Sequence, residues 1–203
     1  MPLFGVTGGI GMGKSVSTGI LGSLGIPTVD TDVLARSEVE PGTPALEEIR
    51  LAFGLDLVDS EGRLDRARLA SLVFSDSSAR NRLEKILHPR IARAWRASVA
   101  DWRQRNLSGA VVIPLLFEKG YESEFDAVVC VACSPETQDS RLHDRGWNDA
   151  HIDARKAAQW SVADKINRSG FVVWTEGSLG SHRRQWERIL ETQSCRNPAI
   201  QAE

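Results

Sequence analysis

The sequence predicts an α/β fold in which helices flank a mostly parallel β-sheet. Continuous apolar runs at 110–116 and 127–132 are typical of parallel strands buried on both faces. Helical patterns at 135–145, 149–160 and 178–191 lie between or after the later strands, and such alternation favours parallel crossovers. A length of 203 residues suits one domain, with room for an inserted subdomain.

Composition excludes several classes of protein. The formal net charge of −2 argues against a globally basic surface for nucleic acid. No apolar run approaches the ~20 residues of a membrane span. Three cysteines are too few, and odd in number, for a disulfide framework. We therefore expect a cytoplasmic protein with no nucleic-acid or membrane partner, as a monomer or small homo-oligomer.

The N-terminal segment predicts a strand, a glycine-rich loop and a helix. Leu3, Phe4 and Val6 form the apolar strand, and glycines follow directly from Gly8. A helical pattern then starts at Lys14 and runs to about residue 24. Residues 28–32 predict a second strand.

Residues 8–15 match the phosphate-loop pattern G-x-x-x-x-G-K-S, and the strand–loop–helix context supports the match. Glycines allow a tight turn whose N–H groups converge on phosphate oxygens, and the helix adds its positive end. Lys14 supplies a charge for the β- and γ-phosphates, and the Ser15 hydroxyl is a ligand for Mg²⁺. The expected ATP contacts are Gly9, Ile10, Gly11, Met12, Gly13, Lys14, Ser15 and Val16.

Other glycine motifs do not fit this loop. A dinucleotide fingerprint requires a third glycine where Lys14 stands. The protein-kinase glycine loop fails in the same way, and neither H-R-D nor D-F-G occurs.

Asp30 and Asp32 lie at the expected end of the second strand. A carboxylate there can accept a proton from an attacking hydroxyl, or hold Mg²⁺ through water. An aspartate that caps the next helix is an equally good interpretation of the residues alone. No aspartate ends the apolar run at 110–116, which favours Asp32 as the main carboxylate near the metal.

An ordered set of motifs resembles the dephospho-CoA kinase family. After the phosphate loop come Asp30-Thr-Asp32, Glu40-Pro-Gly-Thr-Pro44, Leu87-His-Pro89, Pro114-Leu-Leu-Phe-Glu118, Ser134-Pro-Glu-Thr-Gln138 and Arg155-Lys-Ala-Ala-Gln159. The resemblance implies transfer of the γ-phosphoryl of ATP to the ribose 3′-hydroxyl of dephospho-CoA, giving CoA, with Mg²⁺ as cofactor. ATP and dephospho-CoA are the implied partners.

The resemblance also implies roles for residues. Asp32 is the general base, with Lys14 and the lid residue Arg141 as further catalytic groups. Arg145 is a second lid arginine and contacts ATP. The implied acceptor-binding residues are Thr7, Asp32, His88, Pro89, Arg90, Leu115 and Glu118.

The family pattern also suggests boundaries. The expected core covers 1–32, 109–136 and 168–192, with a helical acceptor-binding insertion at about 33–108, a lid at about 137–167 and a flexible tail at 193–203. The sequence departs from the family at 168–177, which leaves the adenine contacts unassigned.

Two further interpretations stay open from the residues alone. One is a kinase for another small acceptor, such as a nucleoside or nucleotide, and the other is a non-catalytic nucleotide-binding switch. The pair Cys130-x-x-Cys133 is interpreted as part of a buried strand, because zinc requires a second pair of ligands nearby.

Overall fold

The computed structural model describes residues 1–196 and divides into two compact units. One unit contains residues 1–29 and the described chain from Val99 onward, and the other is Asp30–Ser98. The first unit contains β1 (Leu3–Thr7), α1 (Lys14–Ser23), β2 (Thr28–Asp30), β3 (Gly109–Val112), the 3-10 turn η2 (Glu122–Glu124), β4 (Ala127–Ala132), α6 (Pro135–His143), α7 (Asp149–Ala157), α8 (Val162–Arg168), β5 (Phe171–Trp174) and α9 (Leu179–Arg196). The second contains α2 (Thr31–Ser37), α3 (Pro44–Phe53), the 3-10 turn η1 (Leu55–Leu57), α4 (Arg66–Ser75) and most of α5 (Ser77–Gln104).

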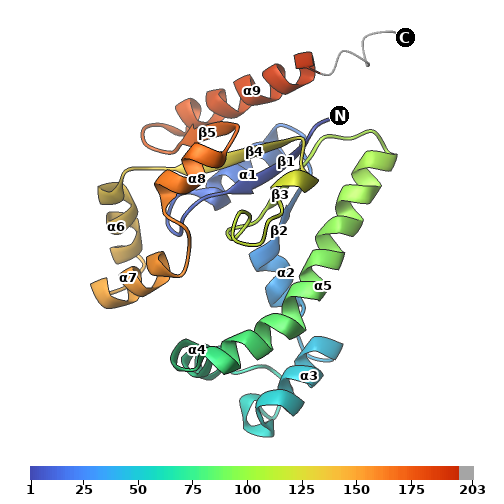
Figure 1. Cartoon of the computed structure of the whole chain (residues 1–203), viewed down its shortest axis with the longest axis vertical. Helices are drawn as coiled ribbons and strands as arrows, with labels where there is room; N and C mark the ends of the chain where they lie inside the picture. Colours follow the sequence, from blue (N-terminus) through green and yellow to red (C-terminus); the bar gives the residue numbers. More distant parts are fainter. Residues whose placement is uncertain (197–203) are drawn as a thin grey trace. The chain divides into compact units, whose positions relative to one another are not determined.

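The sheet has five strands in the order β2-β3-β1-β4-β5 (Figure 1). Strand β1 pairs in parallel with β3 and with β4, and β4 pairs in parallel with β5. Val6 is opposite Val112 on one side and Val129 on the other. The predicted α/β fold with a parallel sheet is confirmed.

Both faces of the central strands are buried, as their continuous apolar sequence predicts. Side chains alternate along β4, so Val129 and Val131 enter one core cluster and Cys130 and Ala132 enter another. The first cluster includes Leu21 of α1 and Trp186 and Ile189 of α9. The second includes Met12 and Cys133, with Val162 and Ile166 of α8 packed against it.

Several predicted boundaries are wrong. Strand β3 ends at Val112, and the chain turns at Pro114, which has no N–H to continue a ladder. The predicted helix at 149–160 stops at Ala157, and a separate helix, α8, follows. Helix α9 reaches Arg196, so it includes part of the expected flexible tail, and residues 197–203 lie outside the described residues.

Helix α5 runs without a break through Pro89, although a proline removes one helical hydrogen bond. Ile86 and Trp95, one on each side of it, are buried, and their packing stabilises the helix across this position. Because of this helix the division between units falls at Ser98, inside the segment 33–108 that the sequence predicts as an insertion.

The unit Asp30–Ser98 has its own small core. Buried Ala45, Ile49 and Leu69 belong to one apolar cluster. Helix α3 begins at Pro44, and the Thr43 hydroxyl accepts a hydrogen bond from the Leu46 amide at 3.3 Å, which satisfies one of the free donors at the helix start. None of the described helices is long and apolar enough to cross a membrane.

Candidate functional site

The glycine-rich loop joins β1 to α1 and is built on left-handed glycine conformations. Gly8, Gly11 and Gly13 have φ values of +145°, +76° and +92°, which side chains rarely allow. A Cβ on Gly8 would lie 2.2 Å from the carbonyl oxygen of Val131, so the loop lies directly on β4. Gly13 caps α1 without any side-chain hydrogen bond, which leaves the helix start to an anionic ligand.

Lys14 and Ser15 begin α1. The Lys14 Nζ donates hydrogen bonds to the carbonyl oxygens of Gly8 and Gly9, both at 2.9 Å. These bonds hold the ammonium group inside the curve of the loop. The Ser15 side chain is exposed beside it.

Two glutamines fix the loop from the other side. Gln138 of α6 is 4% exposed and donates from Nε2 to the carbonyl oxygen of Ile10 at 2.7 Å. The Ile10 amide donates to Oε1 of Gln159 at 3.2 Å. The loop backbone is therefore bound to the segment that carries the predicted lid.

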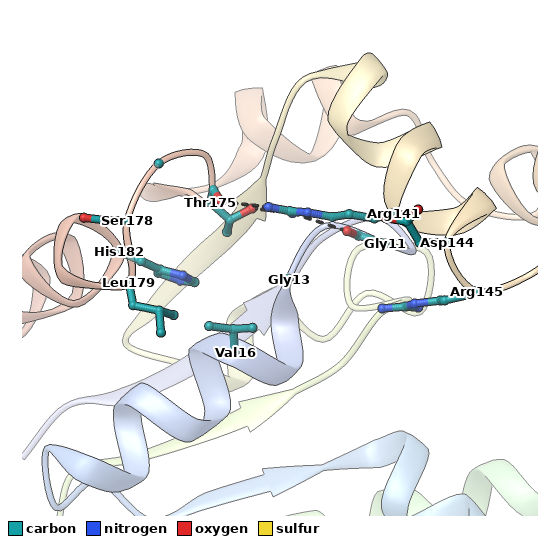
Figure 2. Close-up of a pocket in the computed structure, with 11 residues that line it drawn as sticks. Gly11, Gly13, Val16, Arg141, Asp144, Arg145, Thr175, Ser178, Leu179 and His182 are labelled. Carbon is teal, nitrogen blue, oxygen red and sulfur yellow. Dashed lines mark hydrogen bonds between the residues drawn. The ribbon is translucent and has the colours of Figure 1, made fainter.

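A pocket of about 420 Å³ opens beside the loop. Figure 2 shows Arg141 of α6 and Arg145, just after α6, extending into it, and Leu179 and His182 from α9. Val16 is 43% exposed and Leu179 is 68% exposed, so this end of the pocket offers apolar surface. The lining residues are Gly11, Gly13, Val16, Arg141, Asp144, Arg145, Thr175, Gly177, Ser178, Leu179 and His182.

Thr175 follows β5 and connects three parts of the site (Figure 2). Its Oγ1 accepts from Arg141 Nη1 at 2.8 Å and donates to the Met12 carbonyl oxygen at 3.0 Å. Its carbonyl oxygen accepts from Arg141 Nη2 at 2.8 Å. Both terminal nitrogens of the guanidinium group donate to Thr175, so Thr175 fixes the plane of the Arg141 side chain across the pocket.

Glu176 connects the next position to α6. One carboxylate oxygen accepts from the Ser134 amide at 2.8 Å, and the other accepts from Trp174 Nε1 at 2.9 Å. Hydrogen bonds from the side chains of Ser134 and Thr137, together with that amide and the indole, lower the pKa of Glu176 to about 2.

His182 is a buried histidine in the wall of the pocket. It is 4% exposed, and its Nε2 lies 2.9 Å from Oγ of Ser17, which is fully buried on α1. Burial, and secondarily the charge of Arg141, lowers the pKa of His182, so the imidazole is neutral at pH 7.

The residues expected at the acceptor fall in both units. In the first unit, Thr7 Oγ1 donates to the Pro114 carbonyl oxygen at 3.2 Å. The same carbonyl oxygen accepts from Lys165 Nζ at 2.5 Å, and this fully buried lysine pairs with Glu118 at 2.8 Å. Leu115 is half-buried and lies in the turn between Pro114 and Glu118.

In the unit Asp30–Ser98, the predicted strand through Asp32 is wrong. Asp30 caps α2 and accepts a hydrogen bond from the Asp32 amide at 2.8 Å, so Asp32 is in the first helical turn, where its side chain is exposed. The capping interpretation thus holds for Asp30.

His88, Pro89 and Arg90 lie on α5. His88 Nδ1 is 3.7 Å from a Glu84 carboxylate oxygen. Arg90 donates to Glu48 and to the Ile86 carbonyl oxygen, both at 2.6 Å. Arg90 therefore has structural partners within its own unit.

The cysteine pair Cys130 and Cys133 is buried. Cys130, Cys133 and the exposed Cys195 are free, and burial raises the pKa of Cys130 to about 11, which keeps it a thiol. Within residues 1–196 no group of three or more His, Cys, Asp and Glu side chains is arranged to hold a metal.

Sequence reasoning missed Thr175, Leu179 and His182. Thr175 lies in the segment 168–177 that departs from the family pattern, and Leu179 and His182 lie just after it, where no motif identifies them. Their position in the chain could have indicated them. Gly177, with φ +92°, lies in the loop between β5 and α9, and ligands of open α/β sheets bind beyond the carboxyl ends of the strands.

Comparisons with known proteins agree with this geometry. A family model for dephospho-CoA kinase matches residues 2–180. A dephospho-CoA kinase of Anaeromyxobacter dehalogenans (strain 2CP-C) is 43% identical over 94% of this chain and 91% of its own. Among solved structures, a Thermus thermophilus protein (TM-score 0.82, 33% identity, covering 95% and 97% of the two chains) and a dephospho-CoA kinase from Campylobacter jejuni (TM-score 0.70, 25% identity, covering 96% and 98%) are similar. The chain belongs to the dephospho-CoA kinase family.

Proposed function

We propose that this protein transfers the γ-phosphoryl group of ATP to the ribose 3′-hydroxyl of dephospho-CoA, forming CoA. The observation that carries the proposal is the phosphate loop, with Lys14 bound inside it and a pocket open beside it. Membership in the dephospho-CoA kinase family indicates that the acceptor is dephospho-CoA. The protein is accordingly an ATP-dependent phosphotransferase of CoA biosynthesis.

The phosphate end of the site works through fixed positive groups. Amide groups of residues 9–16 and the N-terminal end of α1 surround the triphosphate. Lys14 moves its ammonium from the loop carbonyls to the β- and γ-phosphates. Catalysis of this kind depends on positioning and on stabilising charge, with little covalent chemistry left to the protein.

The metal fits a site with few protein ligands. The Ser15 hydroxyl is exposed at the helix start, and Mg²⁺ is commonly held by one or two protein groups, phosphates and water. When bound, Mg²⁺ neutralises charge on the β- and γ-phosphates. Ser15 is its ligand in this proposal.

Arg141 and Arg145 belong to the proposed lid at 137–167. Guanidinium groups donate several hydrogen bonds in a fixed plane and keep their charge. Both arginines line the pocket, so both are placed to meet ATP. We assign charge stabilisation during transfer to Arg141 and binding of ATP to Arg145, with α6 and α7 excluding water when the lid closes.

Asp32 is the proposed general base. Its exposed carboxylate at the start of α2 accepts the proton of the attacking 3′-hydroxyl. Thr7, His88, Pro89, Arg90, Leu115 and Glu118 are the proposed acceptor contacts. The helical segment at about 33–108 serves as the acceptor-binding part of one kinase domain that extends to about residue 192.

We further place the enzyme in the cytoplasm, where ATP and reduced thiols such as Cys130 and Cys133 are maintained. We propose that the protein is a monomer or a small homo-oligomer. Light scattering of the purified chain measures its mass in solution and distinguishes the two.

Acceptor-dependent release of ADP tests the function. With MgATP, we expect dephospho-CoA to raise ADP release strongly, and adenosine, AMP or shikimate to do so far less. Stimulation by one of the other acceptors would identify a different kinase. Tight ATP binding without stimulation by any acceptor would indicate a nucleotide-binding switch.

The Asp32→Asn variant tests the general base. Removing a positioned base costs about 10²- to 10⁴-fold in rate, so we expect kcat to fall by at least about a hundredfold with KM for ATP unchanged. Asp30→Ser, which keeps an oxygen to cap α2, is the matched control. Activity of Asp32→Asn within tenfold of wild type would exclude the role.

A further inference from the structure

The pocket beside the phosphate loop has two chemically different ends. Arg141 of α6 and the two residues just after this helix, Asp144 and Arg145, line one end, while Val16 and Leu179 present exposed apolar side chains at the other. Apolar surface suits a flat heteroaromatic ring and not a phosphate chain. Because the loop at Gly11 and Gly13 holds the phosphates, the apolar end lies where the base of the nucleotide is expected.

His182 is the polar group of that apolar end. Its side chain is almost fully buried, yet it lines the pocket (Figure 2). Its Nε2 is paired with the Ser17 hydroxyl at 2.9 Å. Among the described residues the ring has no other hydrogen bond, and Nδ1 is not one of the buried polar atoms that lack a partner, so this nitrogen is accessible from the pocket.

A buried polar group that faces a pocket contributes specificity when a ligand pairs with it and costs affinity when a ligand does not. Burial and the neighbouring Arg141 keep the imidazole neutral. A neutral ring is a poor phosphate ligand, but it can donate to or accept from the edge of a purine. Ser17 fixes its orientation from the buried side of α1.

We propose that His182, oriented by Ser17, is a specificity-determining residue that hydrogen-bonds the purine base of ATP through Nδ1. The inference rests on the proposed function, because it assigns the base end of the same nucleotide site. It also assigns an adenine contact, which the divergent segment 168–177 left without a candidate in the sequence.

Two amide substitutions separate the two ring nitrogens. In His182→Gln the amide lies near the position of Nε2, so the variant keeps a partner for Ser17 and loses Nδ1. In His182→Asn the amide lies near Nδ1, so the variant keeps the group that faces the pocket. Ser17→Ala removes only the orienting hydroxyl.

Calorimetric binding of ATP, GTP and tripolyphosphate, each with Mg²⁺, tests the proposal on the full chain. We expect His182→Gln to bind ATP about three- to tenfold more weakly, since one neutral hydrogen bond is lost, and to prefer ATP over GTP less than wild type does. Tripolyphosphate, which has no base, should bind as it does to wild type. His182→Asn should retain most of the ATP affinity.

Two results would overturn the proposal. Unchanged ATP affinity and unchanged ATP-to-GTP preference in His182→Gln would make the histidine a structural residue. An equal loss for ATP and tripolyphosphate would show a general disturbance of the loop. If His182→Gln does not fold, Ser17→Ala takes its place, with a smaller loss confined to ATP. Binding requires no acceptor, so a failure to phosphorylate dephospho-CoA would leave this test intact.

Discussion

The phosphate end and the base end of the nucleotide site are built in different ways. The phosphate end is one continuous segment, residues 8–15, whose contacts come mainly from backbone groups and Lys14. The base end is assembled from α1, α6, the segment after β5 and α9, and its chemistry lies in side chains such as Thr175 and His182. Backbone sites demand glycine at fixed spacing, whereas side-chain sites accept several residue types.

This difference explains what the sequence predicts and what it does not. The backbone conformations of Gly8, Gly11 and Gly13 require glycine, so the phosphate end has a local glycine pattern that can be recognised from the sequence alone. The base end depends on which segments the parallel sheet brings together, and no local spacing encodes it. Changes at the phosphate end should therefore have larger effects than changes at the base end.

The largest expected effect is that of Lys14→Ala. Removing a positioned charge from the transferring phosphoryl costs about 10²- to 10³-fold in kcat, and we expect at least the lower figure. Lys14→Arg keeps the charge but not the compact geometry, and should recover little. Melting temperatures near wild type are the control, and substantial turnover by Lys14→Ala would contradict the predicted asymmetry.

Gly8→Ala should break the loop itself. The new Cβ would meet the Val131 carbonyl oxygen at 2.2 Å in a backbone conformation with φ +145°. We expect a loss of roughly 2–4 kcal/mol in the free energy of unfolding by urea titration. Gly19→Ala is the matched control, because nothing lies within 4 Å of its Cβ, and it should stabilise α1 by up to about 1 kcal/mol. Equal effects at both positions would contradict the steric account.

Thr175→Val should have an intermediate effect at the junction of the two ends. It removes the hydroxyl that accepts from Arg141 and donates to Met12, with little change of volume. We expect about a tenfold loss in kcat/KM for ATP, and Thr175→Ser should restore it. If Thr175→Val and Thr175→Ser have the same kcat/KM for ATP, the hydroxyl does not position Arg141.

The smallest expected effect is on the pH dependence of stability. The pKa of His182 is lowered in the folded protein, so the unfolded chain takes up this proton first as the pH falls. Its contribution to stability is therefore complete above about pH 6.5 and decreases below it. Between pH 8 and 5.5, the melting temperature of His182→Gln should fall less than that of wild type, with a difference of a few degrees or less. Glu176, with its pKa lowered to about 2, acts in a separate window below about pH 4.5.

Much of the fold was predictable because strands and helices follow local periodicity. The phosphate loop and the first four strands occur where the sequence predicts them, although the second and third strands end earlier than expected. Errors concern places where tertiary packing overrides local signals, such as the continuation of α5 through Pro89. A similar limit applies to Asp30 and Asp32, since only the structure decides which one caps α2.

The most direct test of the central claim is the identity of the product. After incubation with MgATP and dephospho-CoA, mass spectrometry and phosphorus NMR locate any phosphate added to the acceptor. We predict one new phosphomonoester on the ribose 3′-oxygen, formed in equal amount with ADP and formed at least about a hundredfold more slowly by Lys14→Ala. ADP formed without a phosphorylated acceptor, or phosphate at another position, would contradict the account.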